Sequence, residues 1–256
     1  MGKKIISSNN NKVFIIAEAG VSHFGSLKKA KKLIDFAKNA GADAVKFQAY
    51  ITEELVYKNY KDWFKRYKVK EVDYNFFLKL KIYAKKKNII FLCTPHSETA
   101  ITWVDKLNVP AIKVGSGELG NFEFLNKIIK LKKPIIISTG MHTEKDMLNL
   151  KKYFLKMKKK DVCFLNCITQ YPTENSSINL INFKKFKKIF KNFLVGYSDH
   201  TNHDIAIIGS IVLGARIIEK HISLDFKIKN AQDWKVSFDY KRFHMMVKNI
   251  RIMEKV

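Results

Sequence analysis

The sequence predicts a single (β/α)₈ barrel that covers residues 1–256, in which 1–12 form an N-terminal extension or a small β-hairpin. Short β-rich runs alternate eight times with amphipathic, lysine-rich segments. The length of 256 residues suits one barrel of this class. No glycine loop of the dinucleotide-binding type follows any of the runs, which favours a closed barrel over an open doubly wound sheet.

Each expected strand is a run of β-branched and other apolar residues that ends in polar residues. The runs cover residues 13–20, 43–50, 89–96, 111–118, 134–141, 162–169, 193–200 and 216–223. Each expected helix carries lysines between apolar positions at helical spacing, which is typical of a helix with one buried and one solvated face. These helices cover about 26–40, 73–87, 97–106, 121–131, 143–158, 179–191, 202–214 and 238–255.

Composition narrows the class of protein. Hydrophobic residues make up 46% of the chain, which is enough for a large core, and no apolar run approaches the ~20 residues of a membrane span. The N-terminus lacks a secretory signal pattern. Cys93, Cys163 and Cys167 are odd in number and lie in apolar runs, which favours free thiols in a reducing compartment over disulfides or a zinc site. We expect a cytoplasmic protein without a membrane partner.

The net charge of +25 raises the alternative of a nucleic-acid-binding protein. The excess is mostly lysine and is spread over the solvated faces of the expected helices. Arginine, the residue favoured for gripping phosphates and reading bases, is scarce. We therefore expect no nucleic-acid partner, and salt-sensitive retention of RNA or DNA is the observation that the alternative requires.

Polar and ionisable residues collect at the carboxyl ends of the expected strands, where the chemistry of such barrels is carried out. They are Glu18, Lys46, Gln48, Thr94, Lys113, Ser116, Glu118, Ser138, Thr169, Tyr171, Ser198, Asp199, His200, Glu219 and His221. Any one of them is as readily a helix cap or a solvated turn. Their occurrence at every strand end predicts a functional site.

Two lysines indicate an anionic ligand. Lys46 and Lys113 lie inside apolar runs, where an ammonium group is unfavourable unless it meets an anion. Small hydroxyl residues occur beside glycines at 115, 117, 140 and 196, and hydroxyls with free backbone N–H groups suit a phosphate.

Two histidines indicate a metal ion, although this signal is less specific than that of the two lysines for an anion. His200 and His221 each follow a strand-like run and can supply neutral nitrogen ligands to a divalent metal with open positions. A lone histidine is more often a hydrogen-bonded core residue. Acidic groups nearby are candidate bases, namely Glu18, Glu118, Glu219 and Asp233.

Nine ordered stretches resemble the motifs of the N-acetylneuraminate (sialic acid) synthase family, which includes legionaminate, pseudaminate and spore-coat polysaccharide synthases. They are "IIAEAGVSHFGS", "GADAVKFQ", "TPHSETA", "IKVGSGEL", "IISTGM", "YPT", "GYSDHT", "LGARIIEKHISLD" and "AQDWKVSFD". The resemblance implies a barrel enzyme that condenses phosphoenolpyruvate with an N-acyl hexosamine similar to N-acetylmannosamine. Phosphate and a nonulosonic (sialic-type) acid for surface polysaccharide biosynthesis are the implied products, and Mn²⁺ or Mg²⁺ is the implied cofactor.

The resemblance also implies roles for individual residues. His200 and His221 match the metal ligands. The residues that match groups around phosphoenolpyruvate are Lys46, Thr94, Lys113, Ser116, Ser138, Thr169 and Ser198. The residues that match groups around the metal-bound water and the open-chain sugar are Glu18, Gln48, Glu118, Tyr171 and Asp233. Glu18 and Glu118 are alternative proton carriers.

The sequence departs from the family pattern in several places. Thr169 replaces an amide or a serine, "VSHFG" replaces "VNHNG", and Trp234 lies in a stretch that replaces a Gly-Pro-Asp segment. The resemblance does not extend to the C-terminal antifreeze-like domain of typical family members, which in the family supplies an arginine to the partner subunit's site. We expect weak sugar binding unless a second copy of the chain or a separate cap domain completes the site. An acceptor other than an N-acyl hexosamine, or a non-enzymatic barrel, are the alternatives.

Overall fold

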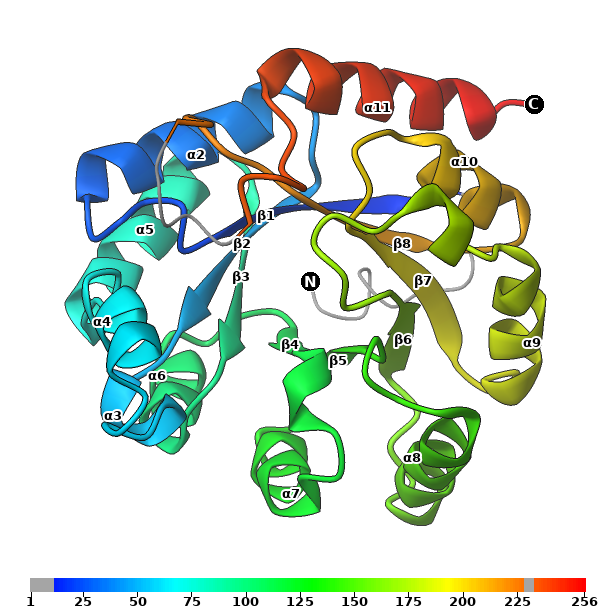
Figure 1. Ribbon diagram of the computed structural model, residues 1–256, viewed down its shortest axis with the longest axis horizontal. Coiled ribbons are helices and arrows are strands. Elements are labelled where there is room, and N and C mark those ends of the chain that lie inside the picture. The colour runs from blue at the N-terminus through cyan, green and yellow to red at the C-terminus, as the bar shows by residue number, and fades with distance from the viewer. Residues whose placement is uncertain (1–11, 228–232) are drawn as a thin grey trace.

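The protein is a closed barrel of parallel strands, each hydrogen-bonded to the next in the order β1 to β8, as the computed structural model of residues 12–227 and 233–256 shows (Figure 1). This confirms the predicted fold class. The strands are β1 Phe14–Gly20, β2 Ala44–Ala49, β3 Ile90–Pro95, β4 Ile112–Val114, β5 Ile135–Ser138, β6 Val162–Asn166, β7 Leu194–Asp199 and β8 Ile217–His221. Apart from residue 12, the expected N-terminal hairpin falls outside the described residues.

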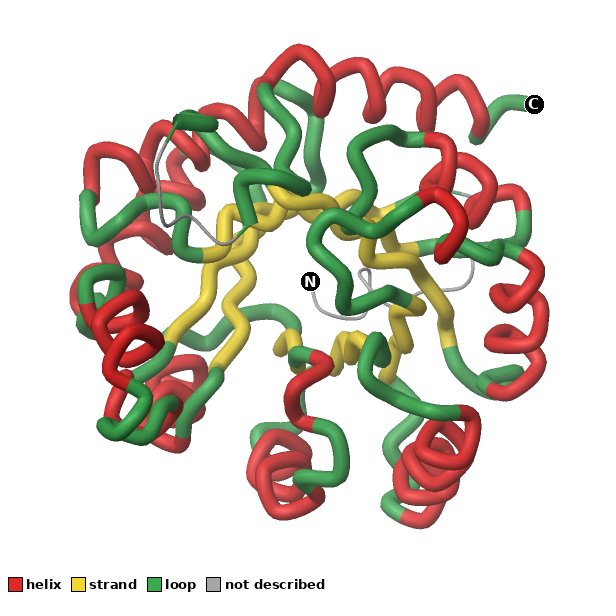
Figure 2. Tube along the Cα trace, in the orientation of Figure 1, coloured by secondary structure: helices red, strands yellow, loops and turns green. Residues whose placement is uncertain are grey.

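The helices form a ring outside the strands, and Figure 2 shows this division into an inner sheet and an outer layer. The helices that follow the strands are α2 Leu27–Asn39, α5 Tyr74–Lys86, α6 Glu98–Lys106, α7 Phe122–Lys130, α8 Glu144–Lys156, α9 Ile181–Ile189, α10 Ile205–Val212 and α11 Tyr240–Met253. Several of them begin at a side chain that accepts a backbone N–H of the first turn, for example Ser26, Asp73 and Thr143. No helix of the described segments is long and apolar enough to cross a membrane.

Two helices between β2 and α5 do not appear among the expected elements. They are α3, Thr52–Leu55, and α4, Lys61–Lys68. The helix α3 is a single turn, and α4 buries none of its residues. Sequence periodicity detects a helix by its buried stripe, so a helix without one leaves little signal.

The expected strand 111–118 is shorter than predicted. Strand β4 ends at Val114, and Ser116–Glu118 form a short 3₁₀ helix, η1. A second one, η2, covers Asn175–Ser177. The polar end of this run therefore turns out of the strand, so Glu118 does not occupy a strand position.

The barrel interior is built in layers because successive strand residues alternate between the inside and the outside. One apolar layer fills the interior and consists of Ile16, Ala44, Leu92, Ala111, Ile136, Cys163, Leu165 and Ile217. A larger apolar core lies between the strands and the helices. The interior layer closes the barrel and forms the floor for the residues that follow it along each strand.

Candidate active site

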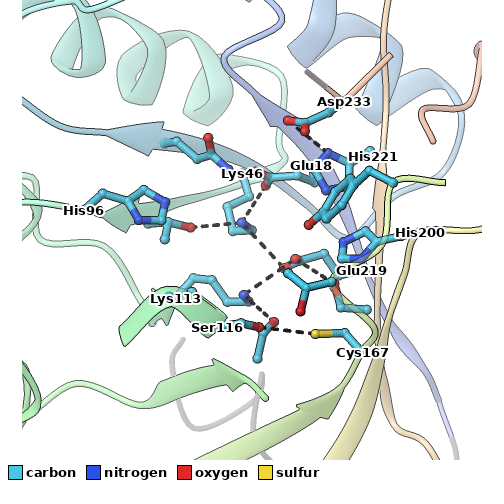
Figure 3. Close-up of a pocket in the computed structure, with 18 residues that line it drawn as sticks. Glu18, Lys46, His96, Lys113, Ser116, Cys167, His200, Glu219, His221 and Asp233 are labelled. Carbon is cyan, nitrogen blue, oxygen red and sulfur yellow. Dashed lines mark hydrogen bonds and ion pairs between the residues drawn. The ribbon is translucent and has the colours of Figure 1, made fainter. Parts of the chain in front are cut away.

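A cavity opens at the carboxyl ends of the strands, directly above the apolar layer (Figure 3). Of the predicted site residues, Glu118 and Asp199 do not line it, and the following do: Glu18, Lys46, Gln48, Thr94, Lys113, Ser116, Ser138, Thr169, Tyr171, Ser198, His200, His221 and Asp233. His96, Cys167, Glu219 and the glycines at 115 and 117 complete the lining. The structure therefore brings the residues from separate strands into one site.

The two-residue period of the strands explains this convergence. Two positions beyond an interior apolar residue, the next inward-facing side chain is polar on almost every strand. Ile16 is followed in this way by Glu18, and Ile217 by Glu219. Glu18 and Glu219 thus belong to a second, polar layer. Its other members are Lys46, Thr94, Lys113, Ser138, Cys167 and Ser198.

Two lysines and two glutamates form a buried network at the centre of this layer. The Nζ atom of Lys46 lies 2.6 Å from Oε2 of Glu18 and 3.6 Å from Oε2 of Glu219. The Nζ atom of Lys113 lies 3.6 Å from Oε1 of Glu219. Glu219 also accepts a hydrogen bond from Ser198 Oγ at 3.1 Å. Four charged groups thus share a site that is almost closed to solvent.

Each lysine is paired with a hydroxyl group from the next strand. Lys46 Nζ donates to Thr94 Oγ1 at 2.9 Å, and Lys113 Nζ donates to Ser138 Oγ at 2.7 Å. An ammonium beside a hydroxyl can bind one anionic group through charge and a further hydrogen bond. The cavity therefore contains two neighbouring positions suited to anionic groups.

Burial and charge separate the protonation states of the two glutamates. Burial raises the pKa of Glu18 to about 7, although Lys46 acts in the opposite direction. Burial also opposes ionisation of Glu219, but Lys113 and Lys46 together lower the pKa of that carboxyl. Glu219 is therefore ionised near neutral pH, where Glu18 can both accept and release a proton.

The histidines lie side by side at the rim of the cavity. The ring centroids of His200 and His221 are 5.3 Å apart, and the ring of Tyr171 lies 4.0 Å from that of His200. The Nδ1 atom of His200 donates to the carbonyl oxygen of Ile168 at 2.6 Å, which leaves Nε2 free. Burial lowers the pKa of both imidazoles, so both are neutral at pH 7.

The donor set suits a metal ion that keeps open positions. Two neutral imidazoles face the cavity, one of them oriented by a backbone carbonyl. Asp233 Oδ2 lies 3.7 Å from Nδ1 of His221, and burial raises the pKa of Asp233 to about 6. No group of three or more His, Cys, Asp or Glu side chains in the described parts of the chain could hold a metal. A metal at this pair would therefore need further ligands from water or substrate.

Ser116, Gly140 and Cys167 pack closely together next to the lysine–hydroxyl pairs. The backbone N–H of Gly140 donates to Ser116 Oγ at 2.9 Å, and Ser116 Oγ lies 3.4 Å from Cys167 Sγ. A Cβ atom at Gly140 would lie 2.7 Å from Cys167 Sγ and 2.8 Å from Thr169 Oγ1. Position 140 therefore requires glycine for this packing.

The sequence interpretation and the cavity differ at a few residues. Glu118 does not line the cavity, and its carboxylate accepts a hydrogen bond from Asn121 Nδ2 at 2.8 Å. His96 and Cys167 line the cavity but were not expected there, and Glu219 was expected at the rim as one of the candidate bases. The two-residue step beyond Thr94 and beyond Leu165 is the signal that identifies His96 and Cys167.

His96 adds a neutral imidazole to the cavity near Lys46 and Lys113. Burial, together with Lys46 and Lys113, lowers its pKa to about 3. Its ring packs against position 115, where a Cβ atom would lie 3.1 Å from its Cε1 atom. One ring nitrogen of a neutral imidazole carries a proton that it can donate.

Comparison with known proteins identifies the family. Residues 33–256 match the model of the NeuB family. The chain is 41% identical over 243 residues to an uncharacterised protein of Methanocaldococcus jannaschii, a match that covers 95% of this chain and 71% of the relative. It is 35% identical over 260 residues to the pseudaminic acid synthase of Campylobacter jejuni, covering 96% of this chain and 75% of that enzyme.

A solved structure agrees with these relatives. The N-acetylneuraminic acid (sialic acid) synthetase of Leptospira borgpetersenii, solved in complex with citrate, superimposes with a TM-score of 0.90 at 33% sequence identity. The match covers 96% of this chain and 85% of that one. On the family match, the sequence identities and the shared barrel, the chain belongs to the NeuB family.

Proposed function

We propose that the protein is a nonulosonic acid synthase that condenses phosphoenolpyruvate with an open-chain N-acyl hexosamine and releases phosphate. The observation that carries the proposal is the pair of lysine–hydroxyl positions, Lys46–Thr94 and Lys113–Ser138, in the same cavity as two neutral histidines. Phosphoenolpyruvate has two anionic groups on a three-carbon frame, and two neighbouring cationic positions suit them. Relatives named as pseudaminic and N,N'-diacetyllegionaminic acid synthases support a sialic-type product.

In this proposal the two anion positions have different ligands. Lys113 and Ser138, with the hydroxyl groups of Ser116 and Thr169 nearby, bind the phosphate. Lys46 and Thr94 bind the carboxylate, and the neutral ring of His96 supplies an additional N–H donor there. Glu219 holds both ammonium groups in place through its two ion pairs.

The histidines define the position of the acceptor. A divalent ion such as Mn²⁺ or Mg²⁺, held by ring nitrogens of His200 and His221, would polarise the aldehyde of the sugar. Tyr171 and Asp233 lie beside the two histidines, Gln48 also lines the cavity, and we expect all three to contact the sugar. In this proposal the aldehyde carbon would face C3 of phosphoenolpyruvate.

The reaction balances with water as the third reactant. The electron pair of the C2–C3 double bond forms a bond from C3 to the aldehyde carbon, the aldehyde oxygen takes a proton from the neutral form of Glu18 and becomes a hydroxyl group, and C2 becomes cationic. The carboxylate of Glu219, which pairs with both lysines, would stabilise that charge. Glu18 then takes a proton from the water that adds to C2, and the C2–O bond to phosphate breaks as the new hydroxyl gives its proton to the phosphate, which leaves a 2-keto acid and inorganic phosphate.

The experiment that tests the proposal is phosphate release in water enriched in ¹⁸O. The protein is incubated with phosphoenolpyruvate, Mn²⁺ and each member of a panel of N-acyl hexosamines, and both products are examined by mass spectrometry. We expect acceptor-dependent phosphate without the solvent label, because the proposal breaks the C–O bond. Solvent label in the phosphate, or phosphate release without an acceptor, contradicts the mechanism.

The metal assignment has a separate test. We expect His200→Ala and His221→Ala to remove Mn²⁺ binding in a titration while the barrel stays folded, because each removes one of two nitrogen ligands. His244→Ala on α11 is the matched control, since that histidine lies on the outer ring of helices. Unchanged Mn²⁺ binding in the double variant contradicts the assignment.

A further inference from the structure

A second ion pair lies directly behind the two histidines, on the outer side of the barrel wall. Lys220 Nζ lies 2.6 Å from Oδ2 of Asp199, and both side chains are completely buried. The same ammonium donates to the carbonyl oxygen of Thr201 at 2.5 Å and lies 4.2 Å from the centroid of the Phe238 ring. Asp199 precedes His200 in the chain, and Lys220 precedes His221.

The register of the sheet couples this pair to the cavity. Asp199 of β7 is the partner of Lys220 of β8, and one step earlier Ser198 is the partner of Glu219. Because side chains alternate, Ser198 and Glu219 meet inside the barrel at 3.1 Å while Asp199 and Lys220 meet outside it. Both pairs therefore hold the same two strands at the point where the histidines leave them.

The pair also holds the chain just beyond each histidine. Asp199 accepts hydrogen bonds from the backbone N–H of Thr201 at 3.1 Å and from its hydroxyl at 3.0 Å. The N–H of Phe238, whose ring covers Lys220, donates to the carbonyl oxygen of His221 at 2.8 Å. Residues on both sides of His200, and the carbonyl group of His221, are thus anchored to one buried cluster.

General stability is a poor explanation for such a cluster. Moving two charges out of water opposes their attraction, and well-packed apolar residues of similar size often stabilise a protein as much or more. A buried ion pair does restrict geometry, since it requires definite positions of its donors and acceptors.

We propose that Asp199 and Lys220 are positioning residues that fix the relative placement of His200 and His221. The inference rests on the proposed metal site, and it assigns a role to two residues that do not line the cavity. The barrel folds without the ion pair, whereas the spacing and orientation of the two imidazoles depend on it.

The test replaces the pair with apolar residues of similar size. In Asp199→Leu/Lys220→Met we expect a free energy of unfolding, measured in urea, equal to or above that of the parent. We expect Mn²⁺ affinity, measured by titration, to fall about 10- to 100-fold, as for other residues that orient metal ligands. A folded double variant that binds Mn²⁺ within about threefold of the parent overturns the proposal.

Two further variants test the charge of the ion pair and provide a control ion pair elsewhere in the barrel. Asp199→Asn keeps the size and shape of the side chain and removes only its charge, so it reports on the ion pair even where the apolar variant does not fold. We expect it to weaken Mn²⁺ binding, and unchanged binding counts against the proposal. Asp43→Leu/Arg251→Met removes a 2.7 Å ion pair at the opposite end of the barrel, and we expect it to change stability but not Mn²⁺ affinity.

A metal-free measurement separates this proposal from the proposed function. In the parent, ¹⁵N NMR of the histidine side chains should show His200 protonated at Nδ1, because that atom donates to Ile168. We expect the apolar double variant to lose this single tautomer. A parent that binds no Mn²⁺ contradicts the metal site, whereas an unchanged His200 signal in the variant contradicts the positioning role.

Discussion

At the scale of single residues, similar groups have acquired different properties from their surroundings. Glu18 and Glu219 are both buried and both contact Lys46, but only Glu219 also pairs with Lys113. The second ammonium keeps Glu219 ionised, while burial raises the pKa of Glu18 to about 7. Glu118, the other predicted proton carrier, lies outside the cavity and is hydrogen-bonded to Asn121.

The two candidate proton carriers can be compared with one substitution each. We expect Glu18→Gln to lower kcat by roughly 10²- to 10⁴-fold, the usual contribution of a general base. We expect Glu118→Gln to change kcat by less than about threefold, because its carboxylate does not line the cavity. Steady-state phosphate release measures both. The reverse ranking contradicts the assignment of Glu18.

The raised pKa of Glu18 predicts how pH affects anion binding. The carboxyl is neutral below about pH 7 and negative above it, so an anion in the same cavity meets additional repulsion as pH rises through 7. We expect phosphoenolpyruvate affinity, measured by calorimetry, to fall across that range. The ligand has its own titration, and Glu18→Gln corrects for it because only the contribution of the glutamate disappears. Identical pH profiles in parent and variant contradict this prediction.

The two buried lysines should be responsible for phosphoenolpyruvate affinity. In Lys46→Ala and Lys113→Ala a charge-assisted contact is lost from a poorly solvated site, which weakens binding by about 2–4 kcal/mol, or roughly 30- to 700-fold. Mn²⁺ affinity should change far less. Lys152→Ala on the exposed face of α8 is the matched control. Affinities within about threefold of the parent in both cavity variants place the anion site elsewhere.

At the scale of elements, the strands were predictable because their patterns are strong. Runs such as residues 89–96 combine apolar content with a polar end, and a parallel barrel brings those ends together. The two-residue alternation that leads from Leu92 to Thr94 also leads to His96, so the place of His96 in the cavity could have been predicted from the sequence. The helix α4 could not be predicted in this way, because it buries no side chain and therefore has no buried apolar stripe.

The position of Glu118 shows another limit of prediction from the sequence. A run ending in polar residues does not reveal where the strand stops, and β4 ends at Val114, four residues before Glu118. The functional pairings across strands, such as Lys113 with Ser138, depend on register and barrel closure. The sequence indicates which residues reach the rim, whereas their distances follow only from the assembled barrel.

The close approach of β7 to its neighbours predicts a large stability effect at Gly196. A Cβ atom there would lie 2.2 Å from the carbonyl oxygen of Ile217 and 2.6 Å from Cδ2 of Leu165, so the strands would have to separate. We expect Gly196→Ala to lower the free energy of unfolding by roughly 1–3 kcal/mol, as measured in urea. Gly117→Ala is the control, because a Cβ atom there has no neighbour within 4 Å. Equal stability of the two variants contradicts this account of the packing.

At the scale of the whole molecule, the cavity and the outer surface use charge in different ways. Inside, the ammonium groups of Lys46 and Lys113 are paired with carboxylates and hydroxyls. Outside, lysines greatly outnumber acidic residues, and the net charge is +25. Exposed ion pairs such as Lys185–Glu144 contribute little to stability and leave most of this excess unbalanced.

The surplus of positive charge predicts that salt stabilises the protein. Like charges repel one another in the compact state, and raising the ionic strength from about 0.01 M to about 0.3 M shortens the range of that repulsion from about 30 Å to less than 8 Å. We expect the Tm to rise by several degrees, which corresponds to about 1 kcal/mol for a domain of this size. Sodium fluoride should match sodium chloride, because screening depends on ionic strength and not on a bound anion. The effect should shrink near pH 9.8, the pI of the sequence, where the net charge approaches zero. A Tm that falls with added salt at pH 7, or a salt effect that persists unchanged near the pI, contradicts the interpretation that the lysine-rich surface is a source of repulsion.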